Sequence, residues 1–259
     1  MTEAVALRVV GLLRAARVEG VVVSGGEPTL LPYLGTLLAE LARPFGAGQA
    51  GPRVVLSTNG LAPPRAMEQI LPHLSWIALP LESADPEEHR RMRTGVAPHR
   101  ERVLALLRGI RAGHPGVGVK LGTVITRLNL AGARRTLDLI TDDRALPDVW
   151  KVYQMSETNY GADNADWLSV EDDVFEEVVR GCEKTAADRG VRLQVYRNST
   201  RGGTYVFIDP DCQVVVVDDA GERRIGGLFE DGEQIGEQLS HLVVGGRNTQ
   251  NFTTTYPEI

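Results

Sequence analysis

Short apolar runs rich in β-branched residues alternate with segments of helical periodicity through the first 157 residues, and this alternation constrains the fold more than any other feature. The runs are VVV, RVVL, WIAL, VGVKLGTVI and VWKVY. Runs such as VVV and WIAL are typical of buried parallel strands, which need crossover connections. The pattern therefore predicts an α/β fold with a parallel sheet, either a full or partial barrel or an open doubly wound sheet.

The sequence changes character after Gln154, where a polar and acidic segment precedes a helical one. The runs RLQVYRNS, TYVFIDPD, QVVVVDD and RRIGG then follow as short strands of an expected antiparallel extension, with a hairpin tip at Ala220 and Gly221. We expect residues 1–157 to form the (β/α) core, residues 158–245 a small β-rich C-terminal extension packed on it, and residues 246–259 a flexible tail.

The charge balance argues against a nucleic-acid polymer as partner. Lys and Arg total 28 and Asp and Glu total 34, which gives a formal net charge of -6, and no long basic cluster occurs. No apolar stretch reaches the roughly 18 residues of a membrane span, and the first twenty residues lack a signal-peptide layout. We therefore expect a cytoplasmic protein without a membrane partner.

The sequence offers no metal-ligand pattern. The two cysteines, Cys182 and Cys212, lie too far apart for a CxxC pair, and the five histidines show no zinc spacing. Both cysteines are expected to be unpaired, inert thiols, and no metal site is predicted from these residues.

The stretch SGGEP follows the first apolar run, where a parallel sheet binds ligands beyond the carboxyl ends of its strands. Gly25 and Gly26 would let a ligand approach the backbone, Glu27 could accept hydrogen bonds from an ammonium group, and Pro28 fixes the exit from the turn. A structural alternative is that the glycines only make a tight turn and that the acid begins the next helix. The polar residues of STNG, after the second run, favour a ligand site.

SGGEP at 24–28 followed by STNG at 57–60 resembles the radical S-adenosylmethionine (SAM) enzymes, whose fold is a partial (β/α) barrel. The later runs WIALPLES, VKLGTVITRLN and VWKVYQ are similar to those of a viperin-like or related subgroup. In this family the Gly-Gly-Glu motif binds the amino group of SAM. The SAM-binding residues that the resemblance implies are Gly25, Gly26, Glu27, Pro28, Ser57, Asn59, Glu82 and Ser83, and the implied substrate residues are Thr123, Lys151 and Gln154. It identifies no catalytic residue.

The chain departs from the family in its cysteines. Members begin with a strand and a CxxxCxxC loop that holds a [4Fe-4S] cluster by three thiolates, and neither Cys182 nor Cys212 occupies a matching place. We expect an N-terminally truncated core that lacks its first strand, with a cluster only where cysteines come from outside this chain. Gly122 and Glu82 also differ from the residues usual at their positions.

Two hypotheses follow. In the first, a cluster loop supplied upstream completes a radical SAM enzyme that cleaves SAM reductively and abstracts hydrogen from a small molecule or nucleotide. In the second, the chain is a cluster-free SAM- or nucleotide-binding or regulatory protein on the same fold. The missing first strand would expose a sheet edge, which a protein partner could cover.

Overall fold

The structure is a computed structural model that describes residues 1–94, 98–157, 159–200, 205–218 and 221–229. The chain forms two compact units. Residues 19–198 make up the larger one, and residues 1–18 join the described part of the chain from 199 onward in the smaller one.

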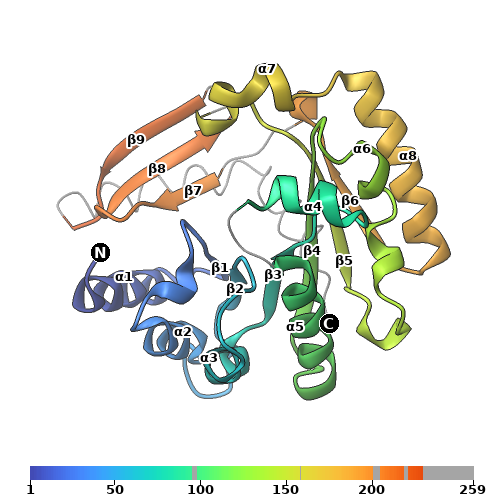
Figure 1. The fold of residues 1–259 in the computed structure, drawn as a ribbon. Coiled ribbons are helices and arrows are strands. Elements are labelled where there is room, and N and C mark those ends of the chain that lie inside the picture. The colour runs from blue at the N-terminus through green and yellow to red at the C-terminus, as the bar shows by residue number, and fades with distance from the viewer. Residues whose placement is uncertain (95–97, 158, 201–204, 219–220, 230–259) are drawn as a thin grey trace. The chain divides into compact units, whose positions relative to one another are not determined.

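The larger unit is built on a six-stranded parallel sheet in the order β1-β2-β3-β4-β5-β6, so neighbours in sequence are neighbours in the sheet (Figure 1). Its strands are β1 (Gly20–Val23), β2 (Arg53–Ser57), β3 (Trp76–Pro80), β4 (Gly118–Ile125), β5 (Val149–Gln154) and β6 (Arg192–Tyr196). Each parallel pair requires a crossover, and helical segments supply it. The parallel sheet predicted from the alternating runs is confirmed.

Helices of very different length make these crossovers. The α-helices are α2 (Leu34–Ala42), α3 (Pro64–Ile70), α4 (Pro86–Met92), α5 (His99–Gly113), α6 (Leu130–Ala133), α7 (Ala165–Leu168) and α8 (Asp172–Asp188). Short 3-10 turns are η1 (Pro28–Leu30), η2 (Leu71–His73), η3 (Thr136–Leu139), η4 (Asp143–Ala145), η5 (Asn159–Asn164) and η6 (Asn198–Thr200). Among the helices of the described residues, none combines the length and apolarity needed to cross a bilayer.

The two faces of this sheet differ in chemistry. Successive strand residues point to opposite faces, and the strand register aligns one fully buried set on the face that packs against helices, here called the helix face. The buried set is Val54, Leu56, Ile77, Leu79, Val119, Leu121, Trp150 and Val152. The opposite face, here called the polar face, carries Arg53, Ser57, Trp76, Lys120, Lys151, Tyr153, Gln194 and Tyr196. Most of the buried apolar strand residues therefore lie on the helix face, and Val55, Trp76 and Val149 are buried on the other.

The smaller unit combines a helix with a three-stranded antiparallel sheet. Its elements are α1 (Glu3–Ala15), β7 (Tyr205–Ile208), β8 (Gln213–Asp218) and β9 (Gly221–Gly227), with the strand order β7-β8-β9. Val9 of α1 packs with Cys212, Val214 and Leu228 in one apolar cluster. The predicted hairpin is confirmed because β8 and β9 pair antiparallel; of the expected tip residues, Gly221 begins β9 and Ala220 lies outside the described residues.

One strand prediction is wrong. We expected RLQVYRNS to belong to the antiparallel extension, but β6 pairs parallel with β5 at the end of the main sheet. The reason is α8, a 17-residue helix that packs on β5 and β6 (Figure 1) and is long enough for a further crossover. Helix α8 and strand β6 therefore belong to the same compact unit as β1 to β5. The expected tail at 246–259 lies outside the described residues.

Candidate functional site

The residues predicted to bind SAM follow β1, β2 and β3 at the edge where the carboxyl ends of the parallel strands meet. The Gly25–Pro28 segment follows β1, Ser57 and Asn59 lie at the end of β2, and Glu82 and Ser83 follow β3. Their common position is a direct result of the parallel sheet, since β1, β2 and β3 are adjacent and run in the same direction.

The Glu27 carboxylate ties the first two strand ends together. Its Oε1 accepts hydrogen bonds from the Thr29 amide at 3.0 Å, the Thr29 hydroxyl at 2.6 Å and the Thr58 hydroxyl at 2.6 Å. Its Oε2 accepts one from the Asn59 amide at 2.6 Å. The structural alternative is therefore correct in part, because Glu27 is the N-cap of η1, but its side chain also reaches across to the loop after β2.

These contacts keep Glu27 ionised. Burial raises its pKa, but the hydrogen bonds from Thr29, Thr58 and Asn59 act in the opposite direction and together hold the pKa below its usual value. A carboxylate has about four lone-pair positions. Because Oε1 accepts three donors and Oε2 only one, Oε2 is the oxygen with capacity left for a ligand donor.

The two glycines before Glu27 present an accessible backbone. Gly25 has a φ of 118°, in the region where a side chain is strained, so the turn itself requires a glycine there. Gly26 needs no such φ, yet a Cβ on either residue would meet nothing within 4 Å. Both are exposed, which suits the close approach of a ligand to the main chain.

Glu82 and Ser83 are committed to contacts inside the protein. Glu82 is 2% exposed, and its carboxylate accepts the Arg93 guanidinium on one oxygen and the Val124 amide at 2.9 Å on the other. The Ser83 hydroxyl is fully buried and donates to Glu88 at 2.6 Å. The structure thus shows how both residues anchor the end of β3, and their contact with SAM stays a prediction.

The three residues predicted to contact substrate do not lie together. Thr123 is fully buried on the helix face, where its hydroxyl donates to the Leu81 carbonyl at 2.6 Å and accepts from the Trp150 indole at 2.9 Å. Gln154 is also buried on that face and donates to Asp172 at 2.6 Å. Lys151 lies on the opposite, polar face. It is one position before Val152, which pairs with Thr123, and three positions before Gln154, and residues an odd number of positions apart on a strand point to opposite sides.

The polar face places a second lysine near Lys151. Lys120 is 2% exposed and lies over the Trp76 ring, with Nζ 4.8 Å from the ring centroid, while Lys151 Nζ lies 4.9 Å from the Tyr196 ring centroid. Tyr196 in turn stacks on Tyr153 with ring centroids 4.8 Å apart. Each of the two lysines therefore lies against an aromatic ring of a neighbouring strand.

Burial makes both lysines weakly basic. It lowers the pKa of Lys151 to about 8, and burial together with the charges of Lys151 and Arg53 lowers the pKa of Lys120 to about 7. Our reading of the sequence missed Lys120. Its signal was a charged residue inside the otherwise apolar run VGVKLGTVI, which only the register places beside Lys151.

The cysteines do not fit an iron-sulfur cluster. Cys182 is fully buried in α8, where burial raises the pKa of its thiol to about 12, and Cys212 is buried in the core of the smaller unit. Cluster ligation requires thiolates that can reach one iron centre. Within the part of the chain that the structure describes, no group of three His, Cys, Asp or Glu side chains could hold a metal ion.

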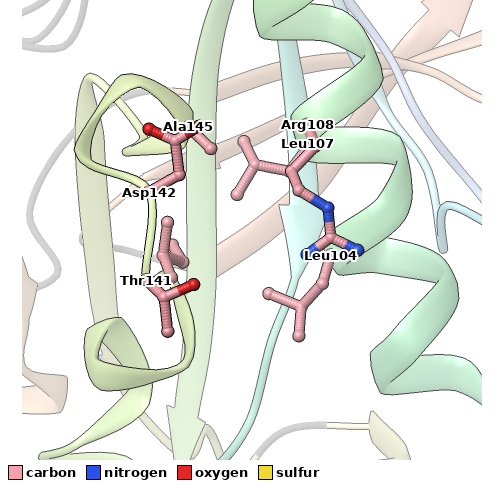
Figure 2. Close-up of a pocket in the computed structure, with 7 residues that line it drawn as sticks. Leu104, Leu107, Arg108, Thr141, Asp142 and Ala145 are labelled. Atoms are coloured by element: carbon pink, nitrogen blue, oxygen red, sulfur yellow. The ribbon is translucent and has the colours of Figure 1, made fainter.

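A small hollow elsewhere in the larger unit is unrelated to the strand ends. It lies between α5 and the segment before β5, and Figure 2 shows Leu104 and Arg108 on one side with Thr141 and Asp142 on the other. The space is about 10 Å3, enough for roughly one water molecule. It is far too small for a nucleoside or a cofactor.

The sequence profile of the radical SAM superfamily matches residues 1–140, more than half of the chain. This chain belongs to the radical SAM superfamily. An S-adenosylmethionine-dependent nucleotide dehydratase from Flammeovirga pacifica is 28% identical over 191 residues, which cover 72% of this chain and 60% of that protein. The chain therefore spans about three-fifths of the length of this curated relative. The predicted superfamily is confirmed.

Solved structures support the same fold. Streptococcus suis SuiB bound to its precursor peptide SuiA superposes with a TM-score of 0.59 at 16% identity, covering 76% of this chain and 42% of that one. A radical SAM methyltransferase from Sphaerobacter thermophilus gives a TM-score of 0.50 at 17% identity, covering 76% and 57%. At such identities the likeness concerns the fold alone, and it confirms the radical SAM type of α/β architecture.

Proposed function

We propose that this radical SAM protein binds SAM at the carboxyl ends of β1 and β2, with the SAM ammonium on Glu27. The observation that carries the proposal is the Glu27 carboxylate itself, which is held rigidly by four hydrogen bonds and keeps acceptor capacity on Oε2. An ionised carboxylate and a ligand ammonium form a charge-assisted hydrogen bond, the stronger kind in proteins.

The surroundings of Glu27 suit the rest of the methionine group. The accessible backbone of Gly25 and Gly26 lies directly before it, where a ligand carboxylate can meet main-chain N–H groups. Pro28 fixes the chain after it, and Ser57 and Asn59 lie across from it at the end of β2. We therefore propose one SAM-binding site made of Gly25, Gly26, Glu27, Pro28, Ser57 and Asn59.

We further propose that the substrate is a nucleotide whose phosphates lie on the polar face against Lys151 and Lys120. Two buried cations on adjacent strands, close enough for one to depress the pKa of the other, attract a multivalent anion. The name of the F. pacifica relative, a nucleotide dehydratase, supports this substrate class. Tyr153 on the same face is half-buried and offers a ring against which a base can stack.

In our proposal, catalysis by this protein requires cysteines from outside this chain. The radical chemistry of the family depends on a [4Fe-4S] cluster, and the two buried cysteines of this sequence do not provide its ligands. We therefore propose SAM and nucleotide binding for the chain, and reductive SAM cleavage only where cysteines come from outside it. The burial of both cysteines favours the second candidate, a cluster-free binding protein.

Calorimetry tests the SAM site. We expect Glu27→Gln to weaken SAM binding at least about tenfold, because a hydrogen bond to a charged group contributes roughly 1.5–3 kcal/mol. Glu87→Gln is the matched control, since Glu87 lies on the exposed surface of α4 and pairs only with Arg90 there. Equal affinities for wild type and Glu27→Gln, with both variants folded by circular dichroism, would remove Glu27 from the site.

A second experiment tests the cluster-free candidate. The 259-residue chain is reconstituted anaerobically with iron and sulfide, and cluster absorbance and 5'-deoxyadenosine are measured. We expect neither, because Cys182 and Cys212 lie in separate cores. A stoichiometric cluster on this chain would eliminate the cluster-free candidate.

A further inference from the structure

Strand β4 carries two glycines on the polar face, and packing within the described residues explains only one of them. A Cβ on Gly118 would come within 2.4 Å of the Trp76 ring, which occupies that space. Gly122 differs, because the nearest described atoms to a Cβ there would be Tyr153 Cε2 at 3.5 Å and the Leu79 carbonyl oxygen at 3.9 Å. Both are ordinary van der Waals contacts, so an alanine would fit at position 122.

The backbone of Gly122 does not require a glycine either. Its φ lies outside the positive region in which a side chain is strained, and it pairs in regular parallel register with Pro80 of β3 and Lys151 of β5. A glycine inside a strand weakens the strand, because it loses more conformational freedom on folding than any other residue. Such glycines often mark a place where a ligand comes close to the main chain.

The two lysines beside Gly122 lean away from it on opposite sides. Lys120, two residues earlier on the same strand, has its Nζ 4.8 Å from the centroid of the Trp76 ring of β3. Lys151, the register partner on β5, has its Nζ 4.9 Å from the centroid of the Tyr196 ring of β6. Gly122 itself is only half-buried. It therefore leaves the polar face without a side chain between two cations.

The spacing along β4 suits the parts of a nucleotide. A strand rises about 3.3 Å per residue, so Gly122 lies about 7 Å from Lys120 in one direction and about 7 Å from Val124 in the other. Val124 is the register partner of Tyr153. With the phosphates at the lysines and the base against Tyr153, the sugar lies over Gly122, where a compact uncharged group can rest on the main chain.

We propose that Gly122 is a specificity-determining residue, whose missing side chain leaves room for the sugar of a nucleotide between Lys120 and Tyr153. This inference rests on the proposed nucleotide substrate and adds to it the position of the sugar. A side chain at position 122 would occupy the same room from the protein side. The same substitution should therefore weaken nucleotide binding without weakening the fold.

Calorimetry at pH 6, where both lysines are largely charged, tests the role of Gly122. We expect Gly122→Ala to weaken the binding of a ribonucleoside triphosphate about tenfold and Gly122→Val about a hundredfold, the range that overcrowded contacts usually produce. Inorganic triphosphate has neither sugar nor base. It should bind equally to wild type and to both variants, because the lysines are unchanged.

Urea unfolding of the same proteins supplies a readout without ligand. Gly122→Ala should be at least as stable as wild type, because alanine loses less conformational freedom on folding. Gly109→Ala is the matched control, since Gly109 is exposed in α5 and its Cβ would meet nothing within 4 Å. It should stabilise the helix and leave the binding of nucleotide and of inorganic triphosphate unchanged.

The possible results separate this inference from the proposed substrate. Equal nucleotide affinity in wild type and in a folded Gly122→Val would overturn the role of Gly122 and leave the substrate proposal standing. Equal weakening of inorganic triphosphate would put a phosphate in that room and overturn the assignment of the sugar. A loss of stability in Gly122→Ala as large as that in Gly118→Ala would show that packing requires the glycine. If wild type binds neither ligand, the substrate proposal and this inference both fail.

Discussion

Proton uptake on nucleotide binding offers a sharp test of the two lysines on the polar face. Their pKa values of about 7 for Lys120 and about 8 for Lys151 lie far below the ordinary lysine value. At pH 8, about one-tenth of Lys120 and about half of Lys151 therefore carry a proton in the free protein. A bound polyphosphate favours the charged form of both lysines and should return their pKa values toward about 10.4.

The size of the effect follows directly. Full protonation of both side chains requires the uptake of about 1.4 protons per nucleotide bound at pH 8, and only about 0.1 at pH 6, where both lysines are already charged. By linkage, the affinity should fall as pH rises through 8, by a factor of about 25 per pH unit at pH 8. Exposed lysines, which keep their charge at pH 8, would give almost no proton uptake.

Isothermal titration calorimetry in buffers of different ionisation enthalpy measures this uptake. Each of the four ribonucleoside triphosphates is titrated at pH 8, where the terminal phosphate is fully ionised. The slope of the observed binding enthalpy against the ionisation enthalpy of the buffer gives the number of protons taken up per nucleotide bound. Lys151→Met should reduce the uptake to at most about 0.9, and Lys120→Met to about 0.5. Tight binding with no proton uptake at pH 8, unchanged in both variants, would refute the assignment of these lysines to the phosphates.

Three further predictions concern the fold around the site. Gly118→Ala should destabilise the protein by about 1–3 kcal/mol in urea unfolding, because its Cβ would overlap the Trp76 ring, whereas Gly122→Ala should be neutral or stabilising, since its nearest neighbour, Tyr153 Cε2, lies 3.5 Å away. Equal losses in the two variants would contradict this packing. Arg93→Met should cost about 3 kcal/mol by leaving the buried Glu82 carboxylate without its cation, and Glu82→Gln in the same chain should recover much of that loss; a double variant no more stable than Arg93→Met would argue against the pair. Cys182 should resist iodoacetamide at pH 8 in the folded protein and react in urea, because its thiol is buried with a pKa near 12; rapid alkylation of the native chain, located by mass spectrometry, would show that α8 is not packed as described.

Local pattern was sufficient for the parallel sheet and for the main ligand motif. Alternating apolar runs and helical segments leave few alternatives to a parallel sheet, and in such a sheet the loops after adjacent strands must meet. The proximity of SGGEP to STNG was therefore predictable, and the hydrogen bonds from Thr58 and Asn59 to Glu27 show it. The family followed from the same two motifs.

Other assignments depended on which side of the sheet a residue faces. Thr123, Lys151 and Gln154 all occur near strand ends, but a strand turns successive side chains to opposite faces, and only the observed register shows that Lys151 shares its face with Lys120. The parallel pairing of β6 depended on whether α8 would serve as a crossover, which no residue within RLQVY indicates.

The sequence by itself determined the parallel α/β fold, the superfamily and the Gly-Gly-Glu turn, because these rest on periodicity and on contiguous motifs. Only the tertiary structure decided that Glu82 and Ser83 anchor β3, that Lys120 joins Lys151, and that the rings of His89 and His99 lie in contact. Those facts rest on contacts between residues 5 to 42 positions apart, and on burial that shifts pKa values. Local sequence carries neither kind of information, since both arise only when the elements pack.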